Sequence, residues 1–416
     1  MKPGKISALS VLVSIVMVVF VITVLNGNAA SPQESTPKEI KIGAVHPMSG
    51  MAARPGELMT RGLILAIEEI NAAGGIKSLG GAKLVLRLGD SQSKVEVGQS
   101  EAERLIQEGV VCLMGAGLSA ITFNTTQVAE RAKIPFIVDT AVADNILERG
   151  FRYVFRVQPN QTNVSKGAAV ALKSLRDKTR QPVNTVVFMH EDSSFGTSCA
   201  DTFKKSAPDY GIKVLADIPF SLKGLTDLTT ELTRVKALNP DLLLYSGYIN
   251  DIILMVRTAK ELKLPVKGIM GVSSMFSEPD VIKELGRDAD YLFDANHRHD
   301  IRNPRTQELM KRYKAKYGED LSVHSTLVHE CVYVLADALE RAKSTDPERL
   351  RNAIAATNYK DHLFPYPGPV KFDNKGECVN ALSIVMQTQG GKIYQVLPIE
   401  IGERDPLYPM VPWDKR

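Results

Sequence analysis

The chain has 416 residues, of which 24% are charged and 44% hydrophobic, and its formal net charge is +4. This length exceeds what one hydrophobic core usually serves, so we expect two domains or lobes. The mild charge, with no basic tract and no aromatic residues interleaved among basic ones, argues against nucleic acid as a partner.

The N-terminus carries the pattern of an export signal. Lys2 and Lys5 precede an apolar run over residues 6–25, and small residues follow this run. We expect a signal peptide over residues 1–29, with cleavage after Ala29. The apolar run is long for a signal, so an uncleaved membrane anchor stays open as the alternative.

Strands and helices alternate through the first part of the chain, after a polar linker. Apolar residues recur at strand or helix spacing, and glycines interrupt the runs. We expect strands over residues 39–45, 82–90, 110–114, 134–138 and 152–157, helices over 58–72 and 95–107, a helix that follows Ser119, and a short helix near Asn145.

The alternation restarts after Pro159 and predicts a second lobe of the same architecture. Strands that alternate with helices indicate an α/β fold with doubly wound parallel sheets. We expect strands over residues 183–190, 212–218, 241–245, 266–270 and 291–294, and helices over 195–210, 225–238, 251–262, 304–317, 325–343 and 347–356, before further strands in the tail.

The stretch over residues 110–144 is the part of the sequence most suggestive of a site. Gly115 and Gly117 end an apolar run, and Ser119 stands where a helix N-cap belongs. Ligands of parallel sheets bind off the carboxyl ends of strands, near helix N-termini. We therefore predict that the loops over residues 116–119 and 139–143 form one wall of a ligand cleft.

The same stretch also fits a dinucleotide fingerprint, which would indicate an NAD-dependent oxidoreductase. Gly115, Gly117 and Ala120 have the required spacing, and Asp139 ends the next strand. The motif alone is weak, it follows the third expected strand rather than the first, and an exported chain meets little free NAD. We keep this reading as a minor alternative.

No other motif indicates an enzyme. The segment from Gly117 to Ile121 lacks the final glycine of a nucleophile elbow, and the histidines have no recognised metal-ligand spacing. We expect no catalytic residue, no metal and no cofactor. Four widely spaced cysteines allow three disulfide pairings, or they are small buried hydrophobes: Cys112, Cys199, Cys331 and Cys378.

Several short motifs occur in a characteristic order from residue 39 to the C-terminus. They are Ile40 to Val45 with Met48-Ser49-Gly50, Ala66 to Ile76, Pro135-Phe136-Ile137, Phe155-Arg156-Val157, His190-Glu191-Asp192 with Phe195-Gly196, and Tyr245-Ser246-Gly247-Tyr248. In this order they resemble the solute-binding proteins of ABC transporters of the branched-chain amino acid (Leu/Ile/Val-binding) type, which have the type I periplasmic binding fold.

The resemblance implies two lobes joined by a three-segment hinge. Lobe one would comprise residues 38–158 plus 295–367, and lobe two residues 159–294 plus 368–416. A small-molecule ligand would bind between the lobes and hold them closed. The protein would work in the periplasm and deliver the ligand to an inner-membrane ABC permease. A sensory ligand-binding receptor domain is the alternative, if the N-terminal run is uncleaved.

The resemblance also implies the site residues. Ser119 matches a serine that binds a ligand carboxylate, although it could be a plain N-cap. Thr140, Ala141 and Val142 match a loop that holds the ligand with backbone groups. Phe195 and Tyr248 match aromatic residues that close from lobe two, although Phe195 could equally be a core residue.

Two positions, Ser273 and Arg54, depart from the family pattern and bear on the ligand. Ser273 falls where an acidic residue typically pairs with an amino-acid ammonium group, and Asp139 is the nearest replacement. Arg54, near a usual aromatic position, suits capture of a carboxylate or is a solvated loop residue. We therefore expect an amino acid, an aromatic or aliphatic acid, or an amide as the ligand.

Overall fold

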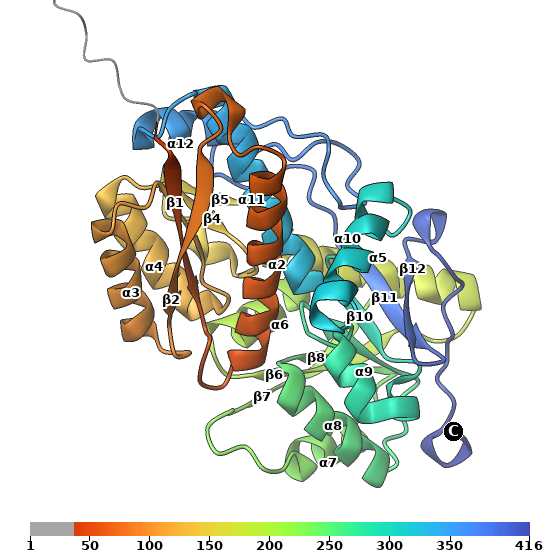
Figure 1. Ribbon diagram of the computed structural model, residues 1–416. Helices are drawn as coiled ribbons and strands as arrows, with labels where there is room; N and C mark the ends of the chain where they lie inside the picture. Colours follow the sequence, from red (N-terminus) through yellow and green to blue (C-terminus); the bar gives the residue numbers. More distant parts are fainter. Residues whose placement is uncertain (1–36) are drawn as a thin grey trace, which may run out of the picture. The chain divides into compact units, whose positions relative to one another are not determined.

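The computed structural model describes residues 37–416 (Figure 1). The expected signal peptide over residues 1–29 lies outside the described residues. Within residues 37–416, no helix combines the length and the apolar character that crossing a membrane requires. The four cysteines are buried free thiols, which agrees with the interpretation of them as small core residues.

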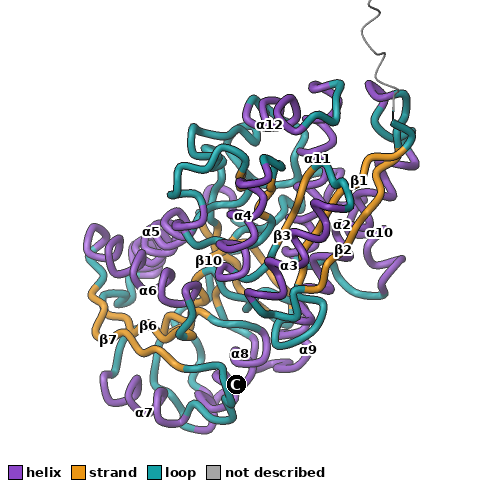
Figure 2. The backbone as a smooth tube through the Cα atoms, turned by 90° about the vertical axis from the view of Figure 1, so that its left-hand side faces the viewer, coloured by secondary structure: helices purple, strands orange, loops and turns teal. Residues whose placement is uncertain are grey.

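The first sheet is parallel throughout and has the strand order β2-β1-β3-β4-β5. Helices α2 and α11 pack on one face, and α3 and α4 pack on the other, as Figures 1 and 2 show. The elements are β1 (Glu39–His46), α2 (Ala53–Ala72), β2 (Lys83–Asp90), α3 (Val95–Gln107), β3 (Cys112–Gly115), α4 (Ser119–Ala132), β4 (Phe136–Val138), β5 (Val154–Arg156) and α11 (Val323–Ala342).

The second sheet has the order β12-β11-β10-β9-β8-β6-β7, and only the pairs made by β11 are antiparallel. Helices α5 and α6 cover one face, and α7, α8 and α9 cover the other. The elements are α5 (Gln161–Thr179), β6 (Thr185–Glu191), α6 (Ser194–Ser206), β7 (Lys213–Phe220), α7 (Thr229–Leu238), β8 (Leu242–Ser246), α8 (Ile249–Glu261), β9 (Gly268–Val272), α9 (Pro279–Leu285), β10 (Phe293–Asn296), β11 (Ile384–Gln389) and β12 (Lys392–Leu397).

The α/β class and the two lobes predicted from the sequence are confirmed. We call each sheet with its covering helices a lobe. The chain passes between the lobes after β5, again after β10 towards α10 (Pro304–Tyr317), α11 and α12 (Pro347–Ala355), and finally before β11. The lobe boundaries at the residue level, 38–158 plus 295–367 and 159–294 plus 368–416, stay a prediction.

Helix α5 is absent from the elements predicted from the sequence, and so is the short helix α9. The buried face of α5 consists largely of small residues, which give a weak apolar signal. Its helical spacing is nevertheless present in Val164, Ala168, Leu172 and Leu175. Asn160 caps the helix by accepting a hydrogen bond from the backbone N–H of Asn163 (3.0 Å).

A close crossing of two helices fixes the position of α11 in the first lobe. A Cβ atom on Gly62 of α2 would lie 2.0 Å from the carbonyl oxygen of Ser325, so only glycine fits there. The Ser325 hydroxyl donates a hydrogen bond to the carbonyl oxygen of Leu58 (2.6 Å). The first turn of α11, which includes His324, is thereby held against α2.

Candidate ligand-binding site

The two loops predicted to form one wall lie side by side because β3 and β4 are adjacent parallel strands. Asp139 links the loops through one carboxylate oxygen. Its Oδ1 accepts hydrogen bonds from the backbone N–H groups of Thr140 (2.6 Å) and Gly117 (3.4 Å). Its backbone N–H also donates to the carbonyl oxygen of Gly115 (3.2 Å). The carboxyl ends of both strands are therefore tied together.

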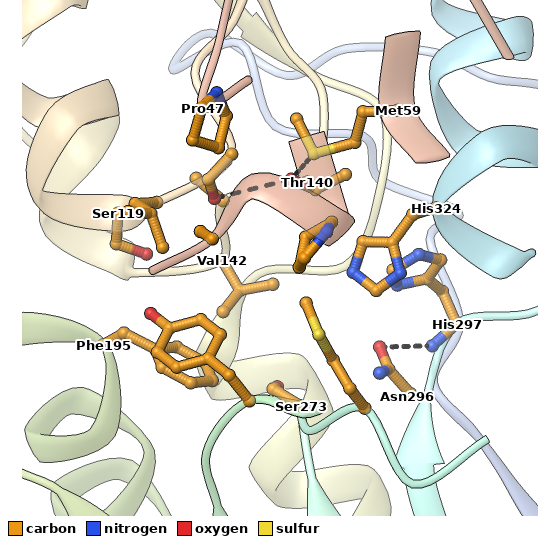
Figure 3. Close-up of a pocket in the computed structure, with 17 residues that line it drawn as sticks. Pro47, Met59, Ser119, Thr140, Val142, Phe195, Ser273, Asn296, His297 and His324 are labelled. Atoms are coloured by element: carbon orange, nitrogen blue, oxygen red, sulfur yellow. Dashed lines mark hydrogen bonds between the residues drawn. The ribbon is translucent and has the colours of Figure 1, made fainter. Parts of the chain in front are cut away.

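A cavity lies beside these loops and encloses about 540 Å³ of empty space, including its opening to solvent. Figure 3 shows residues of both lobes around it. The lining residues are Pro47, Ala52, Pro55, Met59, Gly117, Leu118, Ser119, Thr140, Ala141, Val142, Phe195, Tyr248, Ser273, Met275, Asn296, His297 and His324. The carboxyl ends of the two sheets therefore share one cavity.

Ser119 lines the cavity at the N-terminus of α4. The prediction that Ser119 is the N-cap is wrong, because Leu118 occupies that position without a side-chain cap. The hydroxyl of Thr122 satisfies the backbone N–H of Ala116 instead (2.9 Å). The Ser119 hydroxyl and the first N–H groups of the helix together make a surface that favours an anion.

The second lobe contributes an aromatic pair to the cavity. The rings of Phe195, in the first turn of α6, and Tyr248, at the N-cap of α8, lie 5.5 Å apart with a tilt of 42°. Burial, with Glu191 nearby, raises the pKa of Tyr248 well above its usual value, so its phenol stays protonated. This pair offers an apolar contact and one hydroxyl to a ligand.

The other predicted residues of the two loops, Thr140, Ala141 and Val142, also line the cavity. Ser273 lines it after β9, and its buried hydroxyl has no hydrogen-bond partner among the described residues. The structure thus brings together most of the predicted site residues. Their direct contact with a ligand remains a proposal.

Arg54 is not among the residues that line this cavity. Its guanidinium donates hydrogen bonds to the carboxylates of Glu57 (2.8 Å), Asp280 (3.0 Å) and Glu319 (2.5 Å). A guanidinium engaged by three carboxylates has little capacity left for a ligand, so the geometry gives no support to the predicted carboxylate capture. Because Asp280 lies on α9, Arg54 instead links the two lobes.

Asp139 does not line the cavity either. Its side chain is fully buried, and its Oδ2 lies 2.9 Å from Nε2 of His46, whose Nδ1 lies 2.8 Å from the Thr60 hydroxyl. The carboxylate therefore organises the loops and is not among the residues that line the cavity. The dinucleotide alternative loses the acidic residue that it needs for a ribose.

Two histidines of the cavity, His297 and His324, were not predicted from the sequence as site residues. His297 follows β10, so it obeys the same strand-end rule that located the other loops. His324 lies in the first turn of α11, which begins two residues before the expected start and is capped by Ser322. Within residues 37–416, no cluster of three or more His, Cys, Asp or Glu residues could hold a metal ion.

The chain is similar to a family described as periplasmic binding proteins, whose sequence model matches residues 39–392. The Leu/Ile/Val-binding protein homolog 8 of Brucella suis biovar 1 (strain 1330) is 32% identical over 372 residues, which cover 86% of this chain and 91% of that protein. Homolog 7 of the same strain is 30% identical over 374 residues, which cover 86% of this chain and 92% of that protein.

Solved structures show the same fold. A branched-chain amino acid transporter substrate-binding protein from Streptococcus pneumoniae, in complex with isoleucine, has a TM-score of 0.75 at 23% identity, with 89% of this chain and 100% of that chain covered. An ABC transporter solute-binding protein from R. palustris, in complex with benzoate, has a TM-score of 0.74 at 21% identity. The match covers 86% of this chain and 95% of that chain.

Proposed function

The chain belongs to the periplasmic binding protein family, and from this premise we propose that it is the substrate-binding component of an ABC importer. It binds a small amino acid, or a related carboxylate or amide, between its lobes and delivers it to an inner-membrane permease. The observation that carries this proposal is the cavity to which both lobes contribute residues. Export with cleavage after Ala29 belongs to the same proposal.

The geometry explains how a ligand would hold the lobes together. A ligand that touches Ser119 of the first lobe and Tyr248 of the second gains contacts that an open arrangement lacks, so binding favours closure. Two side-chain pairs already join the lobes beside the cavity. Arg54 pairs with Asp280, and His324 bonds to Glu278, which precedes α9.

One end of the ligand is a carboxylate or an amide oxygen. The N-terminus of α4 supplies N–H groups and a partial positive charge, and Ser119 adds a hydroxyl donor. The two similar solved proteins described above bind isoleucine and benzoate, and both of those ligands contain a carboxylate. This shared group supports a carboxylate as the recognised end in this chain.

Ser119→Ala and Tyr248→Ala should each weaken ligand binding by about tenfold or more, because each removes a hydrogen bond or an apolar contact. A thermal-shift screen of amino acids, aromatic and aliphatic acids and amides identifies a ligand, because binding raises the unfolding temperature. Calorimetry with that ligand then measures the dissociation constants of the variants.

Ser100→Ala is the control for these variants, because Ser100 is exposed on α3 and bonds only to its own helix. The control should bind like the wild-type protein. Unchanged affinity in both Ser119→Ala and Tyr248→Ala would refute the proposed site. A screen in which no amino acid, acid or amide binds would refute the proposed function.

A further inference from the structure

The charge of the cavity restricts the class of ligand. Among the described residues that line it there is no Asp, Glu, Lys or Arg, and the ionisable side chains are those of Tyr248, His297 and His324. A buried ammonium group without a carboxylate partner is costly. A zwitterionic amino acid would bring such a group into this cavity, whereas an acid without an amino group would not.

His297 is a buried polar side chain with unused hydrogen-bonding capacity. It is 3% exposed, and neither of its ring nitrogens has a hydrogen-bond partner among the described residues. Buried polar groups in proteins are nearly always paired. Burial, with His324 nearby, lowers the pKa of His297 to about 3, so its neutral ring offers one donor and one acceptor.

His324 lies beside it, with ring centroids 6.1 Å apart and ring planes at 72°. Its Nδ1 bonds to the buried carboxylate of Glu278, which also accepts from the Ser322 hydroxyl (3.1 Å). Burial disfavours charge on His324, but Glu278, together with Asp294 and Asp139, raises the pKa of His324 above its usual value. This direction favours the form of the second imidazole in which both ring nitrogens donate.

The two imidazoles lie across the cavity from Ser119 (Figure 3). The walls between these two polar ends are largely apolar and come from Pro47, Met59, Val142, Phe195 and Met275. A ligand that satisfies both ends therefore has an anionic head, a hydrophobic middle and a second polar group. The unpaired ring of His297 can pair with an oxygen, and the raised pKa of His324 favours an acceptor beside it.

We propose that His297 and His324 form a second polar subsite, which binds an oxygen at the far end of an organic acid that has no amino group. This inference rests on the proposed function and narrows its substrate class to hydroxy acids, oxo acids and dicarboxylic acids. His297 is the residue that bonds to the distal oxygen, and His324, held by Glu278, lies beside it.

Matched pairs of acids test the subsite by isothermal titration calorimetry. The pairs are 4-hydroxybenzoate with benzoate, 4-hydroxyphenylacetate with phenylacetate, and adipate with hexanoate, and L-leucine, L-tyrosine and benzamide complete the panel. In the pair that binds best, the acid with the distal oxygen should bind about tenfold more tightly than its partner. The two aromatic pairs test whether the subsite binds a hydroxyl, and the adipate pair tests whether it binds a second carboxylate.

Variants of His297 assign the preference to this residue. His297→Phe should reduce the preference to about threefold or less, while the acid without the distal oxygen still binds. His297→Gln, which restores an N–H donor and an acceptor, should recover part of it and serves as the second variant if the first does not fold. His362→Phe is the control, because His362 lies outside the cavity and bonds to the Gly368 carbonyl oxygen (2.9 Å).

Three results would overturn the inference. They are an unchanged preference in a folded His297→Phe or His297→Gln variant, tighter binding of an amino acid than of every acid, and binding of benzamide or an amino acid with no acid bound. Each of these leaves the proposed function intact. If no member of the panel or of the wider thermal-shift screen binds, both the inference and the proposed function fail.

Discussion

Replacing Arg156 by methionine should lower the free energy of unfolding by about 3–5 kcal/mol, because the change leaves the partly buried Glu377 carboxylate and two loop carbonyl oxygens without their partner. Arg156 ends β5 and is fully buried. Its Nε donates to Glu377 (3.0 Å), and its Nη1 donates to the carbonyl oxygens of Ala141 (3.1 Å) and Ala143 (2.9 Å). Urea denaturation measures the effect through the transition midpoint and its slope.

The same change should also weaken ligand binding, because Arg156 holds the loop that contains Ala141. Gln158 still donates to the Ala141 carbonyl oxygen (3.0 Å), so the loop keeps one support and loses the other. We expect a loss of affinity of about tenfold, which corresponds to roughly 1.4 kcal/mol, measured by calorimetry with the ligand that the screen identifies.

Two controls separate the buried ion pair from the effect of losing any arginine. Arg104→Met removes an arginine whose side chain is 42% exposed and whose ion pairs lie on the surface of α3, so it should change stability by about 0.5 kcal/mol or less. Adding Glu377→Gln to Arg156→Met removes the unpaired carboxylate charge and should recover part of the lost free energy of unfolding. A loss below about 1 kcal/mol in Arg156→Met would contradict the assigned role.

Asp139→Ala should cost about 3 kcal/mol of stability or more and reduce ligand affinity at least about tenfold, because one carboxylate joins both loops. The substitution removes the acceptor for the N–H groups of Thr140 and Gly117 and the partner of His46. Thermal or urea unfolding gives the stability, and calorimetry with the identified ligand gives the affinity.

Asp139→Asn is the matched variant, because its carbonyl oxygen can still accept from the loop while its amide faces His46. It should lose clearly less stability than Asp139→Ala. If Asp139→Ala folds and binds ligand as the wild-type protein does, the loops do not depend on this carboxylate. Ligand contact by the loops would then need another explanation.

The sequence predicted the elements whose signal is local. The alternation of apolar runs with helical segments gave the α/β class, and the glycines at Gly115 and Gly117 marked the strand end at the cavity. Helix α5 was missed because alanines fill much of its buried face, and Ser119 was misplaced by one residue because Leu118 takes the N-cap position.

The parts that could not be predicted depend on residues distant in the chain. The partners of Arg54 include Asp280 and Glu319, which lie 226 and 265 residues away, and nothing near Arg54 signals them. His297 and His324 come together through the passage of the chain from one lobe to the other, and Glu278 joins them from a third segment. Of the two histidines, only His297 could have been placed at the cavity from the sequence, because it follows the end of a strand.

A crystal structure of the protein with a bound acid from the screen tests whether the ligand lies between the lobes. We expect electron density for the acid between the lobes, with a carboxylate oxygen within hydrogen-bond distance of Ser119 and the loop after β4 in contact with the ligand. Tyr248 and Phe195 should cover it from the second lobe. Density for the acid that touches only one lobe, or that lies away from both Ser119 and Thr140, would show that the ligand does not bind between the lobes at this cavity.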